Sequence, residues 1–351
     1  MKSDRHDTSG SQTSSRPSPG PSSTSGRDSL LTHVSHRAMA TDFVVMLPEH
    51  AADGVEVVLE ALEMLDSIEA ALTIYNVNSE VSRLNRDGAT KPVKMSAGTF
   101  RLLEKSILWS QRTSGAFDIT AGPLVEAWGF TRRNGQKPTA QEIQTARGLV
   151  GFDKILLDPQ DQTAQLTTAG MTINLGAIGK GDALDRLAAH LKKSGVGDFL
   201  IHGGNSSLIA AGDQDRDSGR GWAVGIAHPT KPKRRLCGLF LRDQALATSG
   251  SGKQFFHHQG RRFGHVIDPR TGYPAGDLAS LTVLMESAAD ADAAATGLFV
   301  LGSDAIDEIT EPWIQCPMIR AAPGRRQDEV EVSTIGQIDW IDPPAESEFD
   351  G

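Results

Sequence analysis

The sequence has 351 residues, of which 38% are hydrophobic and 23% charged, a composition that suits a globular chain with a substantial core. The formal net charge of −9 argues against a protein that binds duplex nucleic acid, because such proteins need a net basic face. A short basic run at 231–235 (KPKRR) is interpreted as a solvated loop.

No stretch approaches the roughly 18 consecutive apolar residues that span a bilayer. The N-terminal MKSDRHDTSG lacks the apolar segment of a secretory signal, and no lipoprotein-type cysteine follows it. We therefore expect a cytoplasmic protein, provided that the start codon is correctly assigned. The cysteines, Cys237 and Cys316, lie far apart in sequence, which favours two small buried side chains over a zinc site or a disulfide framework.

The N-terminal part of the chain begins with residues 1–30, a Ser-, Pro- and Gly-rich tail that cannot offset its ordering entropy by burial, so we expect it to be disordered. Apolar residues recur at helical spacing over 55–72. Thr139 and Glu142 form a capping box at the start of a later helix. Together these patterns predict an extended segment at 33–47, helices at 55–72, at 100–109 and from 139, strands at 154–157, 163–167 and 171–174, and a helix at about 182–193.

The second half is rich in predicted strands, with one Ala-rich helix. The predicted strands cover 199–201, 208–211, 222–226, 236–241, 263–267, 278–285, 314–320 and 329–334, and the helix covers 288–301. No internal repeat or linker-like composition divides the chain. We therefore expect one α+β domain over 31–341, with mixed or antiparallel sheets flanked by helices, and a short C-terminal tail at 342–351.

The segment 174–181 (NLGAIGKG) combines glycines, a predicted helix start and Lys180. Glycines let the backbone pass close to a bulky anion, the first N–H groups of a helix form an anion site, and a lysine adds a point charge. By itself this pattern is also typical of an ordinary strand–turn–helix.

The segment 264–274 (GHVIDPRTGYP) places His265 at a predicted strand end. A histidine there can serve as general base or phosphate contact, although such residues are more often structural. Asp268 is interpreted as a turn cap, and Arg270 as the partner of a carboxylate or a phosphate.

The predicted helix within 287–302 places Asp292 and Thr296 four residues apart, on one face. A carboxylate and a hydroxyl are hard oxygen donors that suit Mg²⁺, and a charge facing an Ala-rich surface needs a partner. The alternative is a surface cap with a buried Thr. In 114–130, Phe117 offers an aromatic face and Asp118 an acceptor for an amide or ribose donor, or the segment is a packed loop.

Taken in order, the motifs resemble the ApbE family of FAD:protein FMN transferases. The matching segments are MATDF (39–43), SEVSRLN (79–85), GAFDITAGPLVEAWGF (115–130), NLGAIGKGDALD (174–185), HGGNSS (202–207), TSGSGKQ (248–254), GHVIDPRTGYP (264–274) and ADAAATGLFVLG (291–302). Four positions depart from the family pattern: Ile119 replaces Pro, Asn174 and Asn205 replace Asp, and Gly252 stands near a common Tyr.

The resemblance implies an ApbE-like (T-fold-like) domain that transfers FMN from FAD to a Ser or Thr hydroxyl of an acceptor protein, using Mg²⁺ and releasing AMP. It implies Mg²⁺ ligands from Asp292, Thr296 and the carbonyl of Ala177. It implies a catalytic base at His265, with Asp292 as the second candidate. The FAD contacts that it implies are Met39, Tyr75, Ala116, Phe117, Asp118, Asn174, Lys180, His265 and Val266.

Two other functions fit the same residues. A metal-dependent FAD pyrophosphatase would release FMN and AMP with water as the nucleophile. A non-catalytic flavin-binding protein would bind FAD tightly and release no AMP. A purely structural domain is the third alternative, and it would leave Lys180, Asp292 and Thr296 unconnected in space.

Overall fold

The computed structural model describes residues 30–344, apart from 132–134, 251, 253–254, 310 and 327–328. The predicted N-terminal tail lies, except for its last residue, outside the described residues. The predicted C-terminal tail lies outside them from residue 345 onward.

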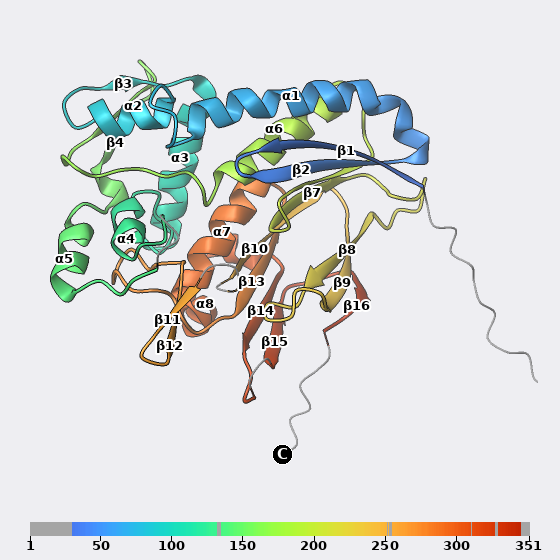
Figure 1. The fold of residues 1–351 in the computed structure, drawn as a ribbon. Helices are drawn as coiled ribbons and strands as arrows, with labels where there is room; N and C mark the ends of the chain where they lie inside the picture. The colour runs from blue at the N-terminus through green and yellow to red at the C-terminus, as the bar shows by residue number, and fades with distance from the viewer. Residues whose placement is uncertain are drawn as a thin grey trace, which may run out of the picture.

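An eight-stranded antiparallel sheet forms the centre of the molecule (Figure 1), in the order β1-β2-β6-β7-β10-β13-β14-β15. Every pairing among the described strands is antiparallel, so the α+β class is confirmed with antiparallel sheets. The strands of this sheet are β1 (Leu31–Ala38), β2 (Thr41–Pro48), β6 (Phe199–Gly203), β7 (Ser207–Ala211), β10 (Gln244–Gly250), β13 (Ser280–Met285), β14 (Met318–Pro323) and β15 (Val330–Ile335).

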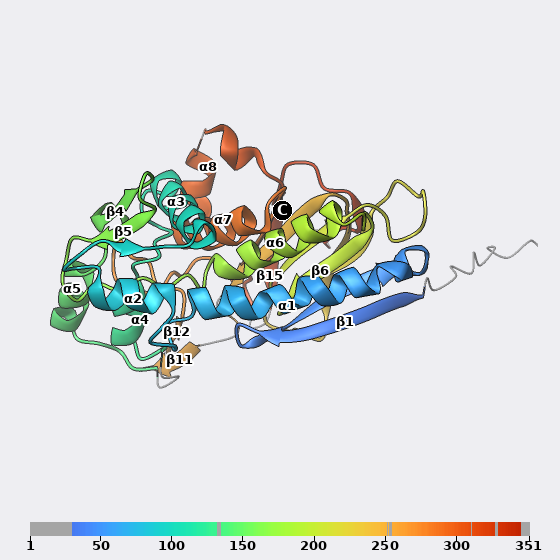
Figure 2. The ribbon, with the colours of Figure 1, turned by 90° about the horizontal axis from the view of Figure 1, so that it is seen from above.

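Three helices pack against this sheet (Figure 2): α1 (Val55–Leu72), α6 (Gly179–Lys193) and α7 (Ala288–Leu301). The buried stripe of α1 matches its apolar spacing, since Leu62, Leu65 and Ile68 all lie in the main core. The predicted bounds of α1 and α7 are confirmed, whereas α6 begins earlier than the predicted 182.

A second, smaller sheet packs against the central sheet, and a second hydrophobic core lies between them. It contains β16 (Trp340–Asp342), β9 (Arg235–Leu241) and β8 (Trp222–Ala227), in that order. Its buried side chains, among them Trp222 and Leu239, join side chains of the central sheet such as Leu246 and Leu284 in one cluster.

The remaining elements lie around one end of α6 and α7. A three-stranded sheet and a β-hairpin belong to this part, and the hairpin packs with α4 and α5 in a third cluster that includes Leu124, Trp128, Ile143 and Phe263. The bounds are α2 (Glu80–Asp87), β3 (Val93–Lys94), α3 (Ala97–Arg112), α4 (Gly122–Ala127), α5 (Ala140–Gly148), β4 (Ile155–Asp158), β5 (Thr163–Leu166), β11 (Phe255–His258), β12 (Arg261–Gly264) and α8 (Ser303–Glu308). Short 3₁₀ turns lie at Glu49–Gly54, Phe152–Lys154 and Pro312–Gln315.

Two predicted segments are wrong. The extended segment 33–47 is a hairpin, because Met39 and Ala40 turn the chain with φ of 51° and 59°. The predicted strand at 171–174 is not a strand: Asn85 donates to the carbonyl of Ile173 at 3.0 Å and accepts from its N–H at 2.7 Å. A side-chain amide thus replaces the neighbouring strand.

Candidate functional site

A cavity of about 1000 Å³ opens where the end of α6, the α7 helix and several loops meet. That volume lies at the upper end of the range for small-molecule sites, roughly 300–1000 Å³. Its lining comes from segments distant in the chain: the turn after β1, the loop before α4, the turn before α6, the β6–β7 turn, the β8–β9 loop, the end of β10 and the segment after β12.

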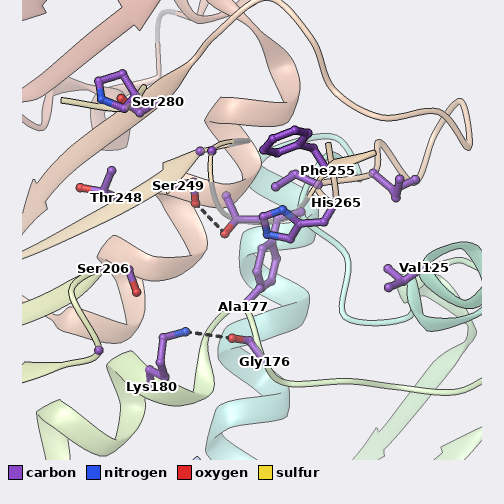
Figure 3. Close-up of a pocket in the computed structure, with 18 of the residues that line it drawn as sticks. Val125, Gly176, Ala177, Lys180, Ser206, Thr248, Ser249, Phe255, His265 and Ser280 are labelled. Atoms are coloured by element: carbon purple, nitrogen blue, oxygen red, sulfur yellow. Dashed lines mark hydrogen bonds between the residues drawn. The ribbon is translucent and has the colours of Figure 1, made fainter. Parts of the chain in front are cut away.

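The turn before α6 forms one wall of the cavity, and Asn174 shapes it. The side-chain oxygen of Asn174 accepts the N–H of Gly176 at 2.8 Å, and the backbone N–H of Asn174 donates to the carbonyl of Ile119 at 2.8 Å. Lys180 lies half-buried in the first turn of α6 and donates to the carbonyl of Gly176 at 3.3 Å (Figure 3). The turn therefore presents a cation and a helix N-terminus to the cavity, which together favour an anionic ligand.

Asp292 lies behind this turn, on α7, with only 7% of its surface exposed. Its carboxylate accepts the N–H of Gly181 at 2.8 Å and the hydroxyl of Ser207 at 2.5 Å. Burial raises the pKa of the Asp292 carboxyl, while the Lys180 ammonium and the two hydrogen bonds act in the opposite direction. The structure thus brings Lys180 and Asp292 together, as the motifs predict.

Small residues make this meeting of α6 and α7 possible. A side chain at Gly181 would place its Cβ 2.2 Å from the carbonyl oxygen of Ala288, so only glycine fits. Alanines along α7 are buried against the sheet and helices, which lets the backbones approach closely. One turn along α7, Thr296 lines the cavity and forms a hydroxyl–hydroxyl hydrogen bond with Ser249 of β10 at 3.1 Å.

The loop before α4 brings Ala116, Phe117 and Asp118 to the cavity. Both carboxylate oxygens of Asp118 hold the loop itself: one accepts the N–H and hydroxyl of Thr120 at 2.8 and 2.7 Å, and the other accepts the N–H of Phe152 at 2.9 Å. Burial raises the pKa of Asp118, and these hydrogen bonds oppose the rise. Its carboxylate is therefore already engaged within the protein.

The segment after β12 places His265 and Val266 in the cavity lining. The ring of His265 packs edge-on to Phe130 at 6.4 Å between centroids, and Figure 3 shows it beside Phe255. Asp268 caps the following turn, as its position predicts, because it accepts the N–H of Arg270 at 2.9 Å. The guanidinium of Arg270 pairs with the same carboxylate, at 2.9 and 3.0 Å.

Two residues of the expected FAD contacts lie outside the lining. Met39 sits in the β1–β2 turn and packs against the main core, while the next residues, Ala40 and Thr41, reach the cavity. Tyr75 follows α1 and is 83% exposed.

The structure also adds residues that the sequence did not single out. These are Ser207 and Ser249, which hydrogen bond to Asp292 and Thr296, and the loop residues His228, Pro229, Thr230 and Pro232. In the sequence, the two serines are indicated only by the family-like motifs that contain them, HGGNSS (202–207) and TSGSGKQ (248–254).

The donors at this end of α7 fit a magnesium ion. Magnesium takes oxygen ligands, keeps several waters, and is commonly held by one or two carboxylates together with substrate phosphates. The buried carboxylate of Asp292 lies behind the cavity lining and needs a cationic partner, whereas Thr296 and Ala177 belong to the lining itself. Within the described part of the chain no three His, Cys, Asp or Glu side chains could hold a metal, so an ion here needs further ligands from substrate or water.

Comparison with known proteins gives one consistent family. The model of the ApbE family matches residues 38–318. The FAD:protein FMN transferase of Haemophilus influenzae is 34% identical over 256 residues, which cover 71% of this chain and 73% of that protein. The one from Vibrio cholerae is 29% identical over 78% of this chain and 82% of that protein.

Solved structures agree with this comparison. The ApbE protein of Thermotoga maritima superposes with a TM-score of 0.77 at 24% identity, over 87% of this chain and 97% of that one. A flavin transferase ApbE from Vibrio cholerae superposes with a TM-score of 0.73 at 27% identity, over 88% and 97%. None of the described helices is both long and apolar enough to cross a membrane.

Proposed function

The chain belongs to the ApbE family and is an FAD:protein FMN transferase; we propose that it moves FMN to a Ser or Thr hydroxyl of its acceptor, with Mg²⁺, and releases AMP. One observation carries this proposal: the N–H of Gly181 donates to the buried carboxylate of Asp292. That contact joins the cationic turn of Lys180 to the oxygen donors of α7 beside one large cavity. We also propose that residues 31–341 form one domain, since a single core cluster extends from Ala38 to Met318.

FAD binding is assigned to the cavity wall around Lys180. The ammonium group and the start of α6 would receive the diphosphate, because both favour a negative ligand. Further contacts are proposed from Met39, Tyr75, Ala116, Phe117, Asp118, Asn174, His265 and Val266. Among the described residues, the side-chain nitrogen of Asn174 has no hydrogen-bond partner, whereas its side-chain oxygen accepts from Gly176, so the nitrogen is available to donate to FAD.

The magnesium ion would be held by Asp292, Thr296 and the carbonyl of Ala177. When bound, it supplies charge neutralisation for the diphosphate oxygens. Ser207 and Gly181 fix the Asp292 carboxylate through their hydrogen bonds, so its orientation is set by the protein. Thr296 is oriented in the same way by Ser249.

In the proposed reaction the acceptor hydroxyl oxygen attacks the FMN phosphorus. A new P–O bond forms, the bond from that phosphorus to the bridging oxygen breaks, and AMP leaves with the bridging oxygen. We assign His265 as the base that takes the hydroxyl proton, because its imidazole lines the cavity. Asp292 is the second candidate, and two hydrogen bonds already occupy its carboxylate.

The test is incubation with FAD, Mg²⁺ and a candidate acceptor, followed by mass spectrometry of the acceptor and chromatography of the nucleotides. The expected result is an acceptor that gains one FMN while an equal amount of AMP appears. FMN and AMP without a modified acceptor would show FAD hydrolysis instead. Bound FAD that stays intact would show a flavin-binding protein without transferase activity.

A further inference from the structure

Positive charge gathers in one stretch of this acidic chain. Residues 218–267 contain nine Lys and Arg but a single acidic residue, Asp243, although the whole chain carries a net charge of −9. This stretch begins just before β8 and ends after β12. It therefore includes the β8–β9 loop and the β11–β12 hairpin, and both contribute residues to the cavity lining.

The β8–β9 loop has a defined conformation, organised by a buried histidine. The Nδ1 atom of His228 accepts the N–H groups of Thr230 and Lys231, both at 3.3 Å. Backbone bonds from Arg234 to Lys231 at 2.7 Å and from His228 to Arg234 at 2.8 Å close the loop. The loop can therefore present its side chains in fixed directions.

The loop divides its side chains between the cavity and solvent. Residues 228–230 and Pro232 line the cavity, whereas Lys231, Lys233 and Arg234 are exposed. The next residue, Arg235, pairs with Asp342 at 3.0 Å. Within the described residues, no carboxylate pairs with the three exposed cations. They form an unneutralised positive edge beside the cavity.

The β11–β12 hairpin adds an aromatic and cationic surface to the same rim. Phe255 is 45% exposed, and the guanidinium of Arg262 stacks 3.9 Å from its ring centroid. His257 packs edge-on against the same ring, at 5.5 Å between centroids. Phe255 and Arg262 also line the cavity, so this surface continues into the site. Aromatic residues and Arg are enriched at protein–protein interfaces.

We propose that the β8–β9 loop and the β11–β12 hairpin form a docking surface for an acidic segment of the acceptor protein. The inference rests on the proposed function, because an acceptor hydroxyl has to reach the cavity that these two elements help to line. Opposite charges speed encounter and fix orientation. The net negative charge of the whole protein repels an acidic partner, so the positive rim selects the productive approach.

The exposed cations are separate from the proposed FAD contacts. Lys231, Lys233 and Arg234 do not line the cavity, whereas Lys180, the proposed diphosphate contact, does. Reversing the three exposed charges should therefore weaken binding of the acceptor and leave FAD affinity unchanged.

The experiment measures fluorescence anisotropy of two labelled peptides with the full chain, FAD and Mg²⁺ present. One peptide is rich in Asp and Glu, and the other has Asn and Gln in their place. The test variant is K231E/K233E/R234E. The control is K91E/R101E/K193E, which changes the net charge equally at exposed positions outside the cavity lining. Thermal unfolding of both variants verifies that they fold.

We expect the wild type to bind the acidic peptide more tightly than the neutral one, with an affinity that falls as salt rises. The test variant should bind it roughly tenfold more weakly, because exposed ion pairs are individually modest and three are lost together. The control should match the wild type.

Equal binding of the two peptides, equal loss in both variants, or a loss of FAD affinity in the test variant would overturn the docking surface. Binding of phosphatidylserine vesicles as tightly as the acidic peptide would also overturn it, in favour of a membrane surface. Peptide binding that behaves as expected, with no FMN transfer by the wild type, overturns the proposed function alone. Transfer without any charge dependence overturns the docking surface alone.

Discussion

Replacing Asp292 by Asn tests the centre of the proposed site without disturbing its packing. The amide has the same shape, so its oxygen can still accept from Gly181, and its nitrogen can donate to the Ser207 hydroxyl. Only the charge is removed. A carboxylate and a unit positive charge about 4 Å away, at an effective dielectric constant near 20, attract each other by about 4 kcal/mol. That energy corresponds to about a thousandfold in rate, since about 1.4 kcal/mol is tenfold.

We therefore expect FMN transfer by Asp292→Asn, measured by mass spectrometry at saturating FAD, to fall by about a thousandfold. The fold should be as stable as the wild type or more stable, because burial raises the pKa of Asp292 and so disfavours its charged form. Asp290→Asn is the matched control on the same helix. It should keep transfer activity but lose stability, because Asp290 pairs with Lys105 and Trp109, both at 2.7 Å. Transfer by Asp292→Asn within a few-fold of the wild type would refute the assignment of the charge.

Two further substitutions, and the pH dependence of the two aspartate variants, test neighbouring claims. Lys180→Met should weaken FAD binding by tenfold or more, because a charge-assisted hydrogen bond contributes about 1.5–3 kcal/mol. Calorimetric titration measures the FAD affinity, and an unchanged affinity would contradict the diphosphate role of Lys180. Gly181→Ala would place a methyl 2.2 Å from the Ala288 carbonyl oxygen, so it should cost about 3 kcal/mol of unfolding free energy in denaturant titration; no loss would contradict the close helix contact. The two aspartates of α7 should respond oppositely to pH. Because the folded protein holds the Asp292 proton more tightly than the unfolded chain, Asp292→Asn gains stability relative to the wild type as pH rises above 3.8. Burial acts to raise the pKa of Asp290, but the hydrogen bonds from Lys105 and Trp109 and the charge of Lys105 together lower it. The stability deficit of Asp290→Asn therefore disappears as pH falls below 3.8, and parallel pH profiles for both variants would refute these directions.

The sequence predicts best where one local pattern decides the structure. Helix α1 follows from its apolar spacing, and α5 follows from the capping box of Thr139 and Glu142, which the structure forms. The bounds of α7 follow from its alanine content and from Gly302 at its end. In each case the local preference and the tertiary packing agree.

Prediction fails where distant side chains determine the backbone. Nothing local shows that Met39 and Ala40 adopt positive φ, since neither is Gly or Asn. The amide of Asn85 takes the hydrogen bonds that a strand at 171–174 would have made, and it is far away in sequence. The hydrogen-bond partners of Asp292 and Thr296 are distant in sequence in the same way. Ser207 and Ser249 contact α7 because the central sheet places their strands beside this helix.

The close crossing of α6 and α7 has a consequence for how the enzyme meets its ligands. With no room at Gly181 for even one more carbon, the two helices cannot slide along each other without steric overlap. The position of Lys180 relative to Asp292 is therefore set during folding, so ligand binding costs little conformational entropy for ordering these two side chains. The loops around the opening are then the part that adapts to acceptors of different shape. Their sequences can change during evolution to accept other proteins while the reacting centre stays unchanged.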